Sequence, residues 1–254
     1  MAKKRKTTSP SSLESQNMIG DKLNFAASEA YKLLRTNLTF SLPDEAGCKV
    51  IGVTSTLHGE GKTTTSINMA YTIAQTGKRV LLLDGDLRLP TVAKRLNLKS
   101  RPGVSNMLAG QCSGGEILQM SGLIDTLAVI TAGDIPPNPA ELLGSEQMST
   151  MVRALSRSFD AIVIDLPPVS AVSDALIVSK LLSGMVVVVR QDYCDKAALS
   201  EVVRQLQFTE VKILGFVMTG STTQEKNYKR YGHYKKRGYY GYGEKTSKTE
   251  AKVK

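Results

Sequence analysis

The sequence is poor in cysteine and has no long apolar run, and both absences bear on where the protein works. Its 254 residues include only three cysteines, at positions 48, 112 and 194, with no CxxC spacing among them. Scattered thiols of this kind suit a reducing cytosol better than a disulfide framework. No stretch approaches the roughly 18 consecutive apolar residues that a membrane-spanning helix needs. We therefore expect a cytoplasmic protein that does not cross the membrane itself.

The N-terminal residues also lack acids, and no apolar signal core follows them. Residues 1–10 carry four positive charges, and residues 222–254 carry ten positive and three negative charges. Residues 11–221 carry 19 positive and 20 negative charges. The net charge of +10 therefore resides at the two ends of the chain, and the part between them is nearly neutral. Basic ends can contact an anionic membrane or a nucleic acid, or can simply be solvated, and no specific nucleic acid is expected.

Strand and helix patterns alternate through the middle of the chain, whose overall composition is that of a soluble globular protein. Apolar runs predict strands at 50–53, 79–84, 127–131, 161–165, 185–189 and 213–218. Helical spacing predicts helices at 25–38, 62–75, 138–158 and 195–207, with short helices and loops over 90–125. This alternation predicts an α/β fold with a mostly parallel sheet and helices on both faces. The predicted divisions are a disordered tail (1–22), one domain (23–221) and a second disordered tail (222–254).

The loop after the first predicted strand has the pattern of a phosphate-binding P-loop, which makes the fold P-loop NTPase-like. Gly59 and Gly61 would let backbone N–H groups turn inward around phosphate oxygens, helped by the N-terminus of the following helix. Lys62 would bring a positive charge to the phosphates of ATP, and the Thr63 hydroxyl would bind Mg²⁺. Thr56 replaces the first glycine of the usual pattern, so the loop is a variant. The predicted nucleotide-binding residues are Gly59, Glu60, Gly61, Lys62, Thr63 and Thr64.

Two further predicted strands end in acidic residues, at the edge where parallel sheets bind their ligands. Asp84 ends one of these strands and is followed by Asp86 and Arg88, while Asp165 ends another in a Walker-B-like pattern. Asp84 or Asp86 could accept the proton of an attacking nucleophile, and Asp165 could hold magnesium. Arg88 could neutralise charge or only pair with a neighbouring acid. The catalytic candidates are Lys62, Asp84, Asp86 and Arg88, and the candidate metal ligands are Thr63, Asp84 and Asp165.

These motifs, in this order, resemble the bacterial tyrosine kinases. The similarity is to the separate cytoplasmic kinase subunit of capsule and exopolysaccharide synthesis in Gram-positive bacteria. It is carried by the P-loop at 59–63, the Walker A′ motif Leu-Asp-Gly-Asp-Leu-Arg-Leu-Pro at 83–90, Walker B at 164–168, and a C-terminal tyrosine cluster. The stretch Ala-Gly-Asp-Ile-Pro-Pro-Asn-Pro-Ala-Glu-Leu-Leu at 132–143 is also similar to the family. The resemblance covers about residues 25–243.

The resemblance implies an ATP- and Mg²⁺-dependent protein-tyrosine kinase that phosphorylates itself and regulates polysaccharide synthesis and export. It implies that Asp84 helps to activate the incoming tyrosine hydroxyl and joins Asp165 at the metal, with Asp86 beside them. It also implies a transmembrane activator subunit, which would hold the kinase at the inner face of the plasma membrane.

The family's N-terminal helix motif, Glu-x-x-Arg-x-x-Arg, joins subunits into a ring, and here it reads Glu29, Lys32, Arg35. Lysine lacks the planar fork of arginine, so a bidentate contact at position 32 is lost. Glu29 and Lys32 could instead only pair with each other along their own helix.

Six of the nine tyrosines lie close together near the C-terminus, among Lys, Arg and Gly. They are Tyr228, Tyr231, Tyr234, Tyr239, Tyr240 and Tyr242. A segment so rich in charge and poor in aliphatic residues cannot bury its rings. It could bind RNA or membrane, or it could present phosphoacceptor hydroxyls to a neighbouring subunit, and the resemblance favours the second. Each phosphate would add about −1.5 to −2 charges, so a few would cancel the basic charge of this segment.

Two other functions are open to such a chain. One is a partitioning or division-site ATPase that binds DNA or membrane, but that class carries a signature lysine where this loop has Leu57. The other is a non-enzymatic binding module that uses its basic tail. Such a module would bind RNA or lipid in a salt-sensitive way and independently of ATP.

Overall fold

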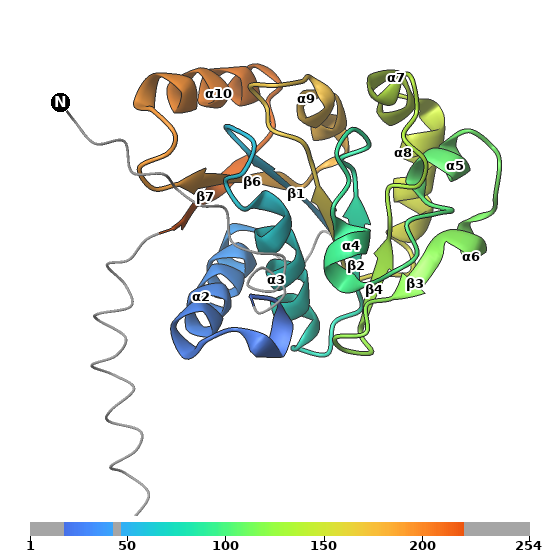
Figure 1. Cartoon of the computed structure of the whole chain (residues 1–254), viewed down its shortest axis with the longest axis horizontal. Coiled ribbons are helices and arrows are strands. Elements are labelled where there is room, and N and C mark those ends of the chain that lie inside the picture. The colour runs from blue at the N-terminus through green and yellow to red at the C-terminus, as the bar shows by residue number, and fades with distance from the viewer. Residues whose placement is uncertain (1–17, 43–46, 221–254) are drawn as a thin grey trace, which may run out of the picture. The chain divides into compact units, whose positions relative to one another are not determined.

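A computed structural model describes residues 18–42 and 47–220 of the chain, and a seven-stranded sheet lies at its centre (Figure 1). The strands are β1 (Lys49–Ser55), β2 (Val80–Asp84), β3 (Leu118–Met120), β4 (Leu127–Ile130), β5 (Ala161–Asp165), β6 (Gly184–Arg190) and β7 (Ile213–Thr219). Their order is β3-β4-β2-β5-β1-β6-β7, and all neighbours are parallel except β3 with β4. The predicted α/β fold with a mostly parallel sheet is confirmed.

Helices cover both faces of this sheet, which explains why its central strands are apolar on both sides. The helices are η1 (Gly20–Lys22), α2 (Phe25–Ser41), α3 (Lys62–Ala74), α4 (Val92–Leu96), α5 (Val104–Leu108), α6 (Gly114–Ile117), α7 (Pro139–Leu143), α8 (Glu146–Leu155), α9 (Asp174–Val178), η3 (Ser179–Leu181) and α10 (Lys196–Phe208). One apolar cluster packs η1 and α2 to α4 against the sheet, and a second packs α5 to α10 on the opposite face. Figure 1 shows α10 and α2 on opposite sides of the strands.

The short strand β3 was not predicted, because residues 90–125 were expected to hold only helices and loops. It spans Leu118–Met120 and pairs antiparallel with β4, Leu118 opposite Ile130 and Met120 opposite Ala128. Three residues are too few to show a strand periodicity in the sequence. The strand exists because the edge of β4 offers it hydrogen-bonding partners.

The single helix predicted at 138–158 is wrong, since the structure breaks it into α7 and α8 at Gly144 and Ser145. The Ser145 hydroxyl accepts a hydrogen bond from the Met148 N–H at 3.2 Å, which makes Ser145 the N-cap of α8. A side chain on Gly144 would lie 3.2 Å from the carbonyl oxygen of Ala140. A capping serine and a crowded glycine together end one helix and begin the next.

Of the tail predicted over 1–22, the structure describes residues 18–22, which pack against the domain. Ile19 is buried in the cluster beneath α3, and η1 follows it directly. The Gly20 N–H donates to the Asn68 side chain at 2.9 Å, and that side chain donates to the Met18 carbonyl at 2.7 Å. Within residues 18–42 and 47–220, no helix combines the length and the apolar character that crossing a membrane requires.

Candidate active site

The phosphate loop connects β1 to α3 at the carboxyl edge of the sheet. Gly59 and Gly61 have φ angles of +85° and +93°, in the left-handed region where a side chain is strained. Gly61 is the N-cap of the 13-residue helix α3, whose first residue is Lys62. A helix of this length concentrates unpaired N–H groups and a partial positive charge at its start, which suits an anion. The backbone of the predicted P-loop residues therefore has a conformation that fits a bound phosphate.

Lys62 joins the loop to the acidic strand ends. Its Nζ atom lies 2.7 Å from Asp86 Oδ2 and 3.7 Å from Asp165 Oδ2, and the residue is only 7% exposed. Burial alone would lower the pKa of Lys62, but the carboxylates of Asp165 and Asp86 outweigh it and raise the pKa. The amine is therefore protonated at neutral pH and ready to receive phosphate oxygens.

The two acids that end β2 and β5 lie side by side, because Asp84 and Asp165 are paired in the parallel ladder. Both are fully buried. Burial and the neighbouring Asp165 raise the pKa of Asp84 well above its ordinary value, and Lys62 offsets this only in part. Burial likewise raises the pKa of Asp165 against the opposing effect of Lys62. One ammonium therefore faces three carboxylates, and the site is short of positive charge.

The arrangement of donors fits a magnesium ion. Asp165 Oδ1 accepts from the Ser66 hydroxyl at 2.9 Å, but its buried Oδ2 has no hydrogen-bond partner among the described residues. A cation would satisfy this oxygen, with the Thr63 hydroxyl at the start of α3 as a second ligand. No three His, Cys, Asp or Glu side chains in residues 18–42 and 47–220 are grouped to hold a metal alone. Mg²⁺ needs no such group, because it binds through one or two carboxylates together with water and substrate phosphates.

Asp84 and Asp86 are held in place by backbone N–H groups of the following segment. Asp84 accepts from the N–H of Asp86 at 3.3 Å and from that of Val92 at 3.2 Å, so both of its oxygens are engaged. Asp86 accepts from the Leu89 N–H through Oδ1, which leaves Oδ2 to Lys62. If Lys62 moved onto a phosphate, Asp86 would therefore lose its ion-pair partner.

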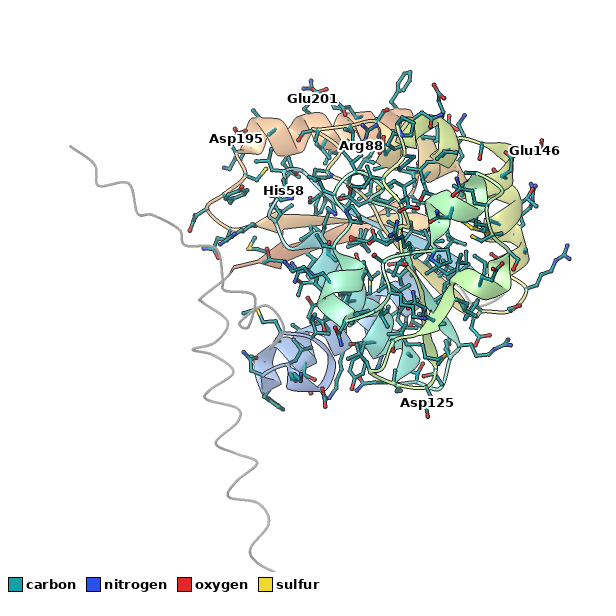
Figure 2. All side chains as sticks on the ribbon, turned by 45° about the vertical axis from the view of Figure 1, so that its right-hand side comes forward. His58, Arg88, Asp125, Glu146, Asp195 and Glu201 are labelled. Atoms are coloured by element: carbon teal, nitrogen blue, oxygen red, sulfur yellow. The ribbon has the colours of Figure 1, made fainter. Side chains whose placement is uncertain are left out.

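Arg88 does not join this cluster. Its Nε and Nη2 atoms donate to the two oxygens of Asp174 at 2.8 and 3.0 Å, and Asp174 is fully buried at the start of α9. The structure thus shows the second of the two expected roles, pairing with a neighbouring acid. Figure 2 labels Arg88 and also His58 of the phosphate loop, both on the side of the molecule where α10 is drawn.

The side chains of Glu60 and Thr64 are engaged within the protein. The Glu60 carboxylate is buried and accepts from the N–H groups of Leu57, at 2.7 Å, and Arg190, at 3.2 Å. Thr64 Oγ1 accepts from Arg95 Nη1 at 3.0 Å. At Glu60 only the backbone is therefore available to a nucleotide, because its side chain braces the loop.

The three residues expected to mediate assembly lie on α2 and have partners within the same chain. Lys32 Nζ binds Glu29 Oε1 at 2.8 Å, one turn away on the helix. Arg35 Nη1 donates to the Thr72 carbonyl of α3 at 2.9 Å and so anchors α2 to the domain. The six expected acceptor tyrosines, Tyr228 to Tyr242, lie outside the described residues.

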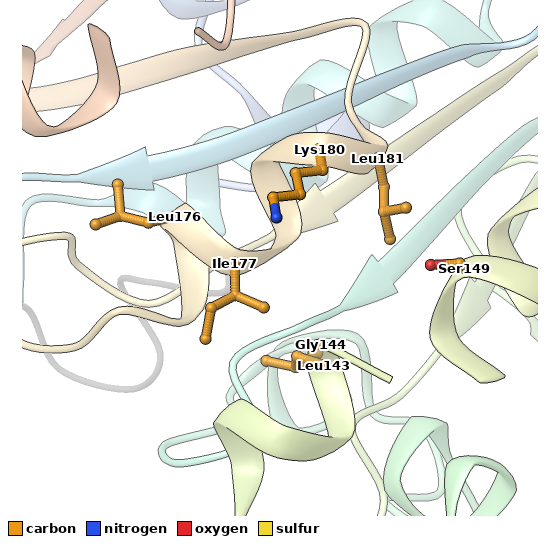
Figure 3. Close-up of a pocket in the computed structure, with 7 residues that line it drawn as sticks. All are labelled: Leu143, Gly144, Ser149, Leu176, Ile177, Lys180 and Leu181. Atoms are coloured by element: carbon orange, nitrogen blue, oxygen red, sulfur yellow. The ribbon is translucent and has the colours of Figure 1, made fainter. Parts of the chain in front are cut away.

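A separate cleft of about 290 Å³ lies between α7, α8, α9 and η3 (Figure 3). Its apolar lining is formed by Leu143, Leu176, Ile177 and Leu181, and Lys180 is its only charged residue. It contains none of the predicted site residues and no acid that could hold a metal, so we assign it no part in phosphoryl transfer.

Several residues of the site were not predicted from the sequence. Ser66 lies one helical turn after Lys62, so the helical register of α3 could have identified it as a neighbour of Asp165. Arg190 and Tyr193 contact the P-loop from more than 130 positions away along the chain. No local pattern marks them, and only the parallel ladder between β1 and β6 brings them to the loop.

Comparison with known proteins gives consistent matches over most of the chain. Residues 48–213 match the family described as AAA domain. The chain is 37% identical over 207 residues to tyrosine-protein kinase YwqD of Bacillus subtilis, covering 82% of this chain and 86% of that protein. It is 32% identical over 234 residues to putative tyrosine-protein kinase CapB of Staphylococcus aureus, covering 92% and 99%. The crystal structure of the chimerical protein CapA2B2 has a TM-score of 0.75 and 33% identity, covering 81% of this chain and 89% of that one.

A more distant similarity concerns the fold alone. The septum site-determining protein MinD of Pyrococcus horikoshii, complexed with Mg-ADP, has a TM-score of 0.57 and 20% identity, covering 70% of this chain and 73% of that one. Proteins with different functions share a fold at this level of identity. The similarity therefore does not favour a division-site function for this chain.

Proposed function

This chain belongs to the bacterial tyrosine-protein kinases, within the AAA-domain family, and we propose that it transfers the γ-phosphoryl group of ATP to tyrosine hydroxyls of its own C-terminal segment. One observation carries the proposal. Lys62, at the start of the phosphate-binding helix, lies within 2.7 Å of Asp86 and 3.7 Å of Asp165. The phosphate-binding charge, the metal-binding acid and a proton acceptor thus meet at one point.

In the proposed reaction Lys62 leaves Asp86 and binds the β- and γ-phosphates. Thr63 and Asp165, with Asp84 beside them, would hold Mg²⁺, which neutralises phosphate charge and orients the transferred group. Asp86 then has an oxygen without a partner and can accept the proton of the tyrosine hydroxyl. Asp84, two residues before Asp86, is the second carboxylate able to take that proton.

Transfer in trans would require subunits to meet, and we place that contact on α2. The motif residues Glu29, Lys32 and Arg35 lie on this helix. Leu33 and Phe40 of the same helix are 56% and 83% exposed and stand two turns apart on one side. Apolar side chains in this position support a protein–protein contact. A ring of kinase subunits, held at the inner face of the plasma membrane by a transmembrane activator, would then phosphorylate its tails and regulate polysaccharide synthesis and export.

The test separates the active site from the acceptors by mixing two variants of the full chain. One variant has phenylalanine at Tyr228, Tyr231, Tyr234, Tyr239, Tyr240 and Tyr242, and the other is Lys62→Met. With labelled ATP, Mg²⁺ and the proposed activator subunit, neither variant alone should acquire phosphotyrosine. Their mixture should label the Lys62→Met chain, because the intact active site of one copy reaches the tail of the other. Label on the six-phenylalanine variant alone, or on Lys62→Met alone, would contradict the proposal.

The competing outcome is an ATPase, in which water rather than tyrosine takes the phosphoryl group. The six-phenylalanine variant tests this directly. A kinase should release phosphate from ATP slowly when its acceptors are removed. An ATPase should release it at the wild-type rate. The position of the ATPase class's signature lysine is occupied by Leu57, whose N–H binds Glu60.

A further inference from the structure

Two side chains, one on the last residue of β6 and one just after that strand, bind carbonyl groups of the phosphate loop. Tyr193 Oη donates to the His58 carbonyl at 3.0 Å, and Arg190 Nη1 donates to the Gly59 carbonyl at 3.3 Å. The Arg190 guanidinium also lies 5.4 Å from the centre of the Tyr193 ring, so the two side chains support each other. Two successive carbonyls of the loop thus accept hydrogen bonds from one short segment, residues 190–193.

The next carbonyl is held by the end of β7. Thr219 Oγ1 donates to the Glu60 carbonyl at 2.6 Å, the shortest of the three contacts. Gly61 packs against the same side chain, since a Cβ atom there would lie 3.5 Å from Thr219 Cγ2. The Glu60 carboxylate meanwhile accepts from the Arg190 N–H at 3.2 Å. β6 and β7 are neighbouring strands, so these donors approach the loop together.

The orientation of three consecutive carbonyls determines the orientation of three N–H groups. In a planar trans peptide the C=O and N–H bonds point in opposite directions. Because the carbonyls of residues 58, 59 and 60 face the donors of β6 and β7, the N–H groups of residues 59, 60 and 61 face the other side. Successive N–H groups that point one way form a concave site for an anion.

We propose that Thr219, Arg190 and Tyr193 are positioning residues that hold the phosphate loop in its anion-binding form before nucleotide arrives. The inference rests on the proposed binding of ATP by this loop. Without these contacts the loop would be flexible, and nucleotide would have to order it on binding. The conformational entropy lost in that ordering would weaken the affinity for nucleotide. The three side chains therefore act on the affinity for nucleotide, whereas the transfer step depends on Lys62 and the aspartates.

Thr219 offers the sharpest test, because valine has its shape and serine keeps its hydroxyl. The dissociation constant of a fluorescent ADP analogue with Mg²⁺ is measured on the full chain. Thr219→Val should weaken binding about 3- to 10-fold, the equivalent of one hydrogen bond, and Thr219→Ser should bind as the wild type does. Tyr193→Phe, which keeps the ring beneath Arg190, should weaken binding by a similar factor. In phosphorylation assays KM for ATP should rise while kcat changes little.

Thr209→Val is the matched control. Its hydroxyl donates to the Leu206 carbonyl at 2.8 Å at the end of α10, a similar bond away from the loop. It should leave the dissociation constant unchanged. Wild-type affinity in both Thr219→Val and Tyr193→Phe would overturn the inference, as would a loss of affinity that serine at 219 does not restore. A wild-type chain that binds no nucleotide would instead overturn the proposed function and this inference with it.

Discussion

Replacing Lys62 by methionine should destabilise the fold as well as abolish catalysis, because the ammonium is the positive charge buried among the three aspartates. It lies 2.7 Å from Asp86 and 3.7 Å from Asp165. At an effective dielectric constant of about 20, unit charges at these distances attract by about 6 and about 4.5 kcal/mol. Burial of the ammonium offsets much of this. Removing one partner of a buried ion pair therefore costs about 3–5 kcal/mol of folding free energy, a fall in Tm of roughly 10 °C.

The loss of folding free energy in Lys62→Met should increase with pH. Burial already raises the pKa of Asp165 in the folded wild type, and loss of the ammonium raises it further. A carboxyl group whose pKa is higher in the folded than in the unfolded protein stabilises the fold while it is protonated. This contribution is complete below the unfolded-state pKa and is lost as pH rises through the folded-state pKa. The Lys62→Met penalty should be largest near pH 8 and should shrink as pH falls toward about 4, the ordinary pKa of an aspartate.

The assay is urea unfolding followed by circular dichroism, since the sequence has no tryptophan to report by fluorescence. Lys94→Met, at an exposed position on α4, is the matched control and should change stability by less than about 0.5 kcal/mol. The double variant Lys62→Met with Asp165→Asn should recover part of the loss without recovering activity. A Lys62→Met penalty below about 1 kcal/mol at pH 8 would refute the reasoning, as would a penalty that does not vary with pH.

Two further predictions concern single acids and their partners. Asp165→Asn keeps an oxygen for the Ser66 hydroxyl but removes the charge beside Asp84. We expect a higher Tm at pH 8 in thermal melts, a gain that disappears toward pH 4, and no phosphotyrosine in the kinase assay. Arg88→Met should lower the free energy of unfolding by about 2 kcal/mol, because Asp174 is left buried and unpaired, and adding Asp174→Leu should restore it. That stable double variant should still phosphorylate tyrosine, because Arg88 pairs with Asp174 and does not join the active-site cluster. Loss of phosphotyrosine would contradict this structural role.

The sequence by itself determined those parts of the site that depend on near neighbours along the chain. A strand, two glycines and a Gly-Lys-Thr step into a helix specify a phosphate loop, because backbone conformation and helix polarity are local properties. Asp84 and Asp165 were also predictable, since each ends an apolar run and parallel strands bring their carboxyl ends to one edge. The same local patterns predicted the α/β class and most of its strands.

Tertiary structure alone decided which of these residues meet and what holds them. The strand order places β2 beside β5, and this pairs Asp84 with Asp165. It also places β6 and β7 where Arg190 and Thr219 can reach a loop 131 and 159 positions away along the chain. Contacts of this kind depend on the register of strands and on packing, and these are set by the whole core rather than by adjacent residues. For the same reason the sequence left two roles open for Arg88, and the buried carboxylate of Asp174 selected one.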